Sequence, residues 1–122
     1  MRIAVLAATA VFAAPVYAVP PDYYKAHTTA ELVAVCSAPT TQTDYATAIA
    51  FCHGVLAGAY GFYVSATPVA ERNICAPDPA PTRSQVATGF IAWTKNNPQY
   101  LKDGAIDTLF RYAAEAFPCK KR

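Results

Sequence analysis

The chain has 122 residues, with ten Lys or Arg against eight Asp or Glu and a formal net charge of +2. This length suits one small domain with a modest core. Because the charges nearly balance, the sequence lacks the basic excess of nucleic-acid-binding domains, and we expect no nucleic-acid partner.

The N-terminus has the pattern of a secretory signal peptide. Arg2 precedes an uncharged apolar stretch over 3–14, and Val16-Tyr17-Ala18 fits the small-x-Ala rule of signal peptidase. The stretch is shorter than the ~20 residues that a membrane-spanning helix needs. We therefore expect a signal peptide over 1–18, cleaved after its last residue, and a soluble exported domain over 19–122.

The exported part contains an even set of cysteines, which indicates disulfides in a small secreted domain. They are Cys36, Cys52, Cys75 and Cys119. No Cys-x-x-Cys pair is present, and His27 and His53 do not cluster with acidic residues. Neighbours on a helix point about 100° apart, so His53 cannot serve Cys52 as a base. We expect no metal, no cofactor and no catalytic residue.

Capping signals and hydrophobic periodicity predict the first two helices. Thr28-Thr29-Ala30-Glu31 has the form of a capping box and opens a short helix that ends near Cys36. Apolar residues then recur at three- and four-residue spacing from Tyr45 to Tyr60, which predicts a second helix over about 44–64.

Prolines separate the second helix from the third. Pro68, Pro77, Pro79 and Pro81 remove backbone donors, which predicts a long Pro-rich loop over 66–81. Thr82-Arg83-Ser84-Gln85 is a second capping box, and the helix it opens should stop at Asn96-Asn97-Pro98. A fourth apolar stripe runs from Ile106 to Phe117. The predicted fold is an all-α, four-helix domain with no strand.

The uncharged stretch 45–70 also permits a transmembrane interpretation. It contains Gly54-x-x-x-Gly58, a spacing that membrane helix pairs use. Polar residues such as His53 dilute the stretch, and the same glycines would let a helix of a soluble bundle pack closely against its neighbours. A disulfide at Cys52 could not form inside a bilayer. We expect no membrane span after signal cleavage.

Four segments of the chain carry a resemblance to a known family. They are Leu32 to Ser37, Cys52-His53-Gly54 with Gly58 one turn on, Ile74-Cys75-Ala76-Pro77, and Ala-Ala-Glu-Ala-Phe-Pro-Cys over 113–119. In this pattern the chain resembles the Rap/Tai family of immunity proteins, which protect bacteria against type VI secretion amidases. Val55 and Ala76 depart mildly from the residues usual in the family.

The resemblance implies a small helical periplasmic protein, often dimeric, that binds a peptidoglycan amidase and blocks its active site without catalysis of its own. Four cysteines allow three pairings. We favour Cys36 with Cys52, because this bond ties adjacent helices. Cys75 with Cys119 would then fasten the loop to the C-terminus.

For the amidase contact, we expect the polar loop residues Glu71, Arg72 and Asn73, with 95–103 as a second candidate. The alternative function is a periplasmic stress protein or chaperone that holds unfolded clients on exposed apolar surface. An enzyme that uses a free cysteine is a third reading, which complete disulfide pairing would exclude.

Overall fold

The computed structural model describes residues 18–120, so the predicted signal peptide lies outside the described residues except for Ala18. Four α-helices form, and no strand is present over this range. They are α1 (Thr29–Cys36), α2 (Tyr45–Ala66), α3 (Arg83–Asn96) and α4 (Ala105–Ala116). Three short 3-10 helices add to them: η1 (Pro21–Lys25), η2 (Val69–Glu71) and η3 (Pro98–Tyr100). The all-α prediction is confirmed.

Both predicted capping boxes form, and they place the helix starts where the sequence indicates. The Thr28 hydroxyl accepts the amide of Glu31, whose carboxylate accepts the Thr28 amide in return. Thr82 and Gln85 exchange the same pair of bonds at the start of α3. These reciprocal bonds satisfy amides that the first helical turn leaves free.

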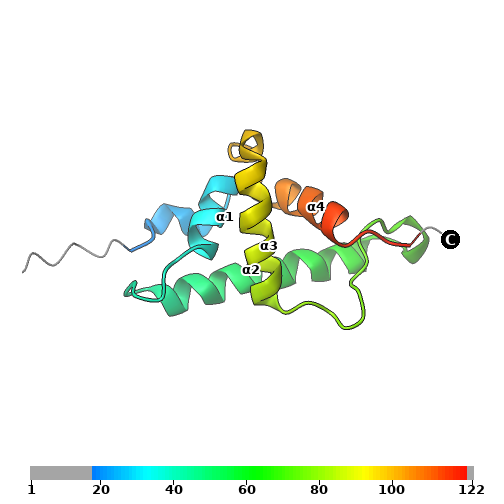
Figure 1. Ribbon diagram of the computed structural model, residues 1–122, viewed down its shortest axis with the longest axis horizontal. Helices are drawn as coiled ribbons and strands as arrows, with labels where there is room; N and C mark the ends of the chain where they lie inside the picture. Colours follow the sequence, from blue (N-terminus) through cyan, green and yellow to red (C-terminus); the bar gives the residue numbers. More distant parts are fainter. Residues whose placement is uncertain (1–17, 121–122) are drawn as a thin grey trace, which may run out of the picture.

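Helix α2 forms a long base on which α1 and α3 pack, and α4 packs against α1 and α3. Figure 1 shows α1 near the N-terminal end of α2, α3 crossing near its middle, and α4 above its C-terminal half. At the crossing, His53 Nε2 lies 3.5 Å from the Ser84 hydroxyl. The core lies between α1, α3, α4 and the first half of α2, and its largest fully buried apolar side chains are Phe90, Leu32 and Val35.

The two disulfides confirm the preferred pairing. Cys36–Cys52 joins α1 to α2 inside the core, with Cys52 fully buried. Cys75–Cys119 joins the Pro-rich loop to the C-terminal tail at the surface. Both bonds together pair all four cysteines of the chain.

One expectation about α2 is wrong. Its glycines were expected to let neighbouring helices approach, but a Cβ added at Gly54, Gly58 or Gly61 would meet nothing within 4 Å. The neighbours instead pack on the face that carries Ala48, Cys52 and Leu56. The glycines face outward because α1 and α3 already cover the opposite side.

Candidate partner-binding surface

The C-terminal half of α2 leaves unusually large apolar side chains in solvent. Phe62 is 72% exposed and Tyr60 38% exposed, and Val69 on η2 is 64% exposed. We call these three residues the apolar end. Tyr60 and Phe62 are two residues apart on the helix and therefore point to different sides of it, so the apolar end is defined by its place in the chain.

By length and composition alone, the same helix could cross a membrane, and 17% of its most apolar window is buried against the rest of residues 18–120. One such helix is weak evidence for a span. Cys52 lies in this helix, and its buried disulfide with Cys36 ties the helix to α1.

An apolar groove of about 330 Å³ lies beside the apolar end. Leu56 of α2, Ile74 and Pro81 of the loop, and Leu109 and Phe117 at α4 contribute to its lining, and Arg83 is the one charged residue among the lining residues. The groove is therefore apolar, with a cation on its wall. Such a surface favours apolar side chains accompanied by an acidic group.

The second disulfide holds two walls of this groove together. On either side of Cys75–Cys119, the Cys75 amide donates to the Phe117 carbonyl at 2.8 Å and the Cys119 amide donates to the Asn73 carbonyl at 3.2 Å. The loop and the tail are thus joined by two backbone bonds and a covalent link. A wall fixed in this way is ordered before a partner arrives, which reduces the entropy cost of binding.

The predicted contact residues lie at this same end of the molecule, but two of them have internal roles. The Arg72 guanidinium donates to the carbonyls of Thr67 and Val64, so it satisfies orphan acceptors where α2 ends. The Asn73 side chain accepts from the Tyr63 hydroxyl at 2.9 Å. The Glu71 side chain is exposed and makes no hydrogen bond within residues 18–120.

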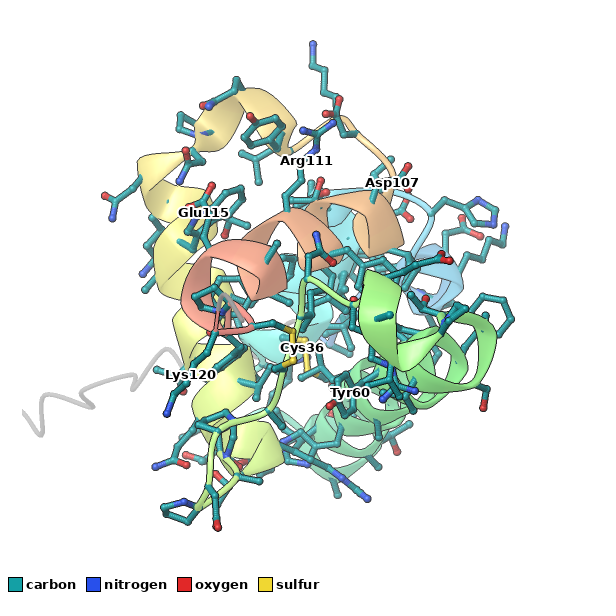
Figure 2. The ribbon with its side chains drawn as sticks, turned by 90° about the vertical axis from the view of Figure 1, so that its right-hand side faces the viewer. Cys36, Tyr60, Asp107, Arg111, Glu115 and Lys120 are labelled. Atoms are coloured by element: carbon teal, nitrogen blue, oxygen red, sulfur yellow. A yellow bond between two sulfur atoms is a disulfide. The ribbon has the colours of Figure 1, made fainter. Side chains whose placement is uncertain are left out.

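A second, polar surface covers part of the other predicted segment, 95–103. Tyr100 stacks on Trp93 with ring centroids 5.5 Å apart, and the Arg111 guanidinium lies 5.2 Å from the Tyr100 centroid. Trp93 Nε1 donates to Glu115 at 2.7 Å. Figure 2 shows Asp107, Arg111 and Glu115 following one another along the outer side of α4. Tyr, Trp and Arg are the residues most common at binding hot spots.

The sequence predicts 95–103 as a candidate contact, and Tyr100 of this segment lies in the polar surface, but the residues of α4 were not predicted. Asp107, Arg111 and Glu115 are four residues apart, so they lie on one helix face. This spacing was a usable signal. The spacing could not show that Arg111 contacts Tyr100 or that Glu115 contacts Trp93. These two aromatic residues come from other elements of the fold.

The comparison with family models identifies the chain. A model described as Rap1a immunity proteins matches residues 28–119. The chain belongs to the Rap1a immunity protein family. Neither the comparison with curated proteins nor that with solved structures gives a match.

The match to the Rap1a immunity proteins begins at the first capping box and ends at the second disulfide. It therefore contains all four cysteines, the groove, the polar surface and the predicted contact residues. Membership in this family makes the chain an immunity protein for a secreted effector.

Proposed function

We propose that this immunity protein acts in the periplasm, where it binds a peptidoglycan amidase delivered by type VI secretion and covers the amidase active site. The family match over 28–119 carries the proposal. Two disulfides and the predicted signal peptide support an oxidising compartment outside the cytoplasm. A wall-cutting enzyme would act in that same compartment. The chain inhibits by occlusion and supplies no catalytic group.

We place the amidase contact at the apolar end together with Glu71. Phe62 and Val69 offer apolar area, and Glu71 offers an unpaired charge beside it. Arg72 and Asn73 support the contact indirectly, since their hydrogen bonds hold η2 against the end of α2. Of the three predicted residues, Glu71 would thus contact the amidase directly, and Arg72 and Asn73 would hold Glu71 in position.

The test begins with the search for a peptidoglycan amidase encoded beside this chain and measures whether the two proteins bind. The exported protein should bind that enzyme and abolish its hydrolysis of peptidoglycan. Phe62→Ser and Glu71→Lys should each weaken binding tenfold or more, as expected at a hot spot. Asp22→Lys makes the same charge reversal on η1, at the other end of the molecule in Figure 1, and should leave binding unchanged. Full amidase activity in the presence of excess wild-type protein would rule the proposal out.

A homodimer is the second part of the proposal. Gly54, Gly58 and Gly61 leave open space along α2, so the helix of a second copy could approach closely there. Gly58→Leu should then lower the dimer fraction in sedimentation experiments, whereas Ala46→Leu, also exposed near the start of α2, should not. A wild-type protein that sediments as a monomer at high concentration would contradict it.

The exposed apolar end also favours the alternative function, a periplasmic chaperone. A chaperone would suppress aggregation of unrelated unfolded proteins. If the protein suppresses such aggregation and does not bind an amidase encoded beside it, the proposed amidase target is wrong. The chaperone function then replaces it.

A further inference from the structure

Val19 is the one buried residue in the exposed stretch from Ala18 to Tyr23. Ala18 is exposed, whereas the Val19 side chain is 8% exposed and belongs to the core cluster. The backbone nitrogen of Val19 donates to Asp44 Oδ2 at 3.3 Å. The peptide bond between Ala18 and Val19 therefore joins an exposed residue to one whose side chain packs in the core and whose nitrogen contacts Asp44.

Asp44 is directed toward this N-terminal segment. It is the N-cap residue of α2, but its side chain caps no amide of that helix. Its Oδ2 also accepts the Tyr24 hydroxyl at 2.9 Å, and its Oδ1 accepts the Gln42 amide at 2.6 Å. These hydrogen bonds, that from Gln42 foremost, lower the pKa of Asp44 below its usual value, so the group is a carboxylate at neutral pH.

We propose that cleavage between Ala18 and Val19 creates an α-ammonium group that pairs with the Asp44 carboxylate and locks the mature N-terminus onto the start of α2. The inference rests on the proposed export. Signal peptidase breaks the C–N bond with one water: the hydroxyl goes to the Ala18 carbonyl and a proton to the Val19 nitrogen. That nitrogen then takes a second proton from solvent and becomes cationic beside Asp44.

The surroundings leave Asp44 as the partner for the new cation. Asp22, the acidic residue on η1, already pairs with Lys25 at 2.8 Å. Tyr24 also faces this position, but burial and then its bond to Asp44 raise its pKa, so it stays a neutral phenol. Gln42 carries no charge. The precursor has an amide nitrogen here, so the ion pair exists only after processing.

The test uses the full chain, exported through its own leader. N-terminal sequencing of the purified product should begin at Val19. A variant with one glycine inserted between Ala18 and Val19 keeps the cleavage site but moves the ammonium away by one residue. Its unfolding equilibrium constant should rise about fivefold over that of the wild type, as for a partly exposed ion pair.

A double-mutant cycle isolates the pair. In an Asp44→Asn background the glycine insertion should have no effect on the unfolding constant. In the matched Asp22→Asn background it should keep its full effect. A mature chain that begins elsewhere than Val19 would overturn the inference at the cleavage step, and an equal effect in both backgrounds would overturn it at the pairing step.

A measurement on the wild type covers the case in which Asp44→Asn fails to fold. The α-amino group can be labelled by ¹³C reductive methylation and titrated by NMR. Pairing should raise its pKa above the ~7.7 to 8.0 of a free terminus. An amino group that titrates at or below that range would overturn the inference. These measurements involve no amidase, so they are separate from failure of the immunity proposal.

Discussion

The hydroxyl group of Tyr112 on α4 fills the space beside Gly89 on α3 that a Cβ atom would need. Any larger residue at position 89 would clash with it. The Tyr112 ring is buried and packs near Phe90, with centroids 5.9 Å apart, and near Phe117 at 6.0 Å. Gly89 therefore sets how closely α3 and α4 approach. The same burial raises the pKa of the Tyr112 phenol.

Gly89→Ala should destabilise the protein. In an open helix position this change stabilises by roughly 0.5–1 kcal/mol, but here the added methyl group meets Tyr112 and overpacking costs about 1–3 kcal/mol. Urea unfolding measures the difference. Gly54→Ala, where nothing lies within 4 Å in a single copy, is the matched control and should stabilise when unfolding is measured at a concentration too low for the proposed dimer to form.

Tyr112→Phe should restore part of the stability lost in Gly89→Ala, because it removes the closest atom. The ring carbon that carries the hydroxyl would lie 3.1 Å from the new methyl group, so the recovery should be incomplete. Strictly additive effects of the two changes would show that the clash is not the cause.

Thr108→Val should be neutral or stabilise by up to about 1 kcal/mol. Over residues 18–120, the Thr108 hydroxyl is the one buried side-chain oxygen without a hydrogen-bond partner, so valine removes an unsatisfied group and keeps the shape. The comparison is Thr29→Val. Thr29 is equally buried, but its hydroxyl donates to the Asp103 carbonyl at 3.2 Å, and its loss should cost about 1 kcal/mol. Thermal unfolding of both variants should give opposite signs.

Stability should fall in acid through Asp44. Hydrogen bonds from Gln42 first, and also from Tyr24, lower its folded pKa below the usual value of 3.8. A group with a depressed folded pKa contributes stability above its unfolded pKa, and that contribution is lost as pH falls through the folded pKa. The free energy of unfolding of the wild type should thus drop below about pH 4.

Asp44→Asn should flatten this acid limb, because an amide does not titrate there. Asp78→Asn, in the exposed Pro-rich loop, is the control and should leave the limb in place. Identical acid limbs in the wild type and Asp44→Asn would show that other carboxyl groups control the acid transition.

The two disulfides should open in order under limited reduction. Cys75 is exposed, whereas Cys52 is fully buried, so a small thiol reaches the Cys75–Cys119 bond first. Alkylation and mass mapping should find label at 75 and 119 before 36 and 52. By the loop-entropy model, the Cys75–Cys119 bond contributes about 4 kcal/mol to the free energy of unfolding and the Cys36–Cys52 bond about 3 kcal/mol. Simultaneous labelling of all four cysteines would show that the first reduction already unfolds the core.

Much of the fold follows from signals a few residues apart. The capping boxes at Thr28 and Thr82 fix two helix starts, because the reciprocal bonds form within four residues. Pro68 explains why α2 ends at Ala66, two residues beyond the predicted end. The short helices η1, η2 and η3 were not predicted, because single 3-10 turns lack a periodic pattern.

The candidate site was predicted less completely. The segment that contains Glu71 lies next to the apolar end, and its role in a contact stays a prediction. Its polar residues were all treated as free, however, and Arg72 and Asn73 turned out to bind Thr67, Val64 and Tyr63. A side chain's partner depends on which elements fold beside it, and this information is spread over the chain.

The sequence by itself determined the four helices and the disulfide-linked small domain, because these rest on local capping, periodicity and cysteine number. The resemblance of four segments pointed to the family, which the match over 28–119 then showed. Only the tertiary structure decided which face of α2 is covered, where Tyr112 meets Gly89, and that Val19 enters the fold beside Asp44. These relationships join residues on different elements. They arise from how the helices cross, which depends on the packing of the whole core.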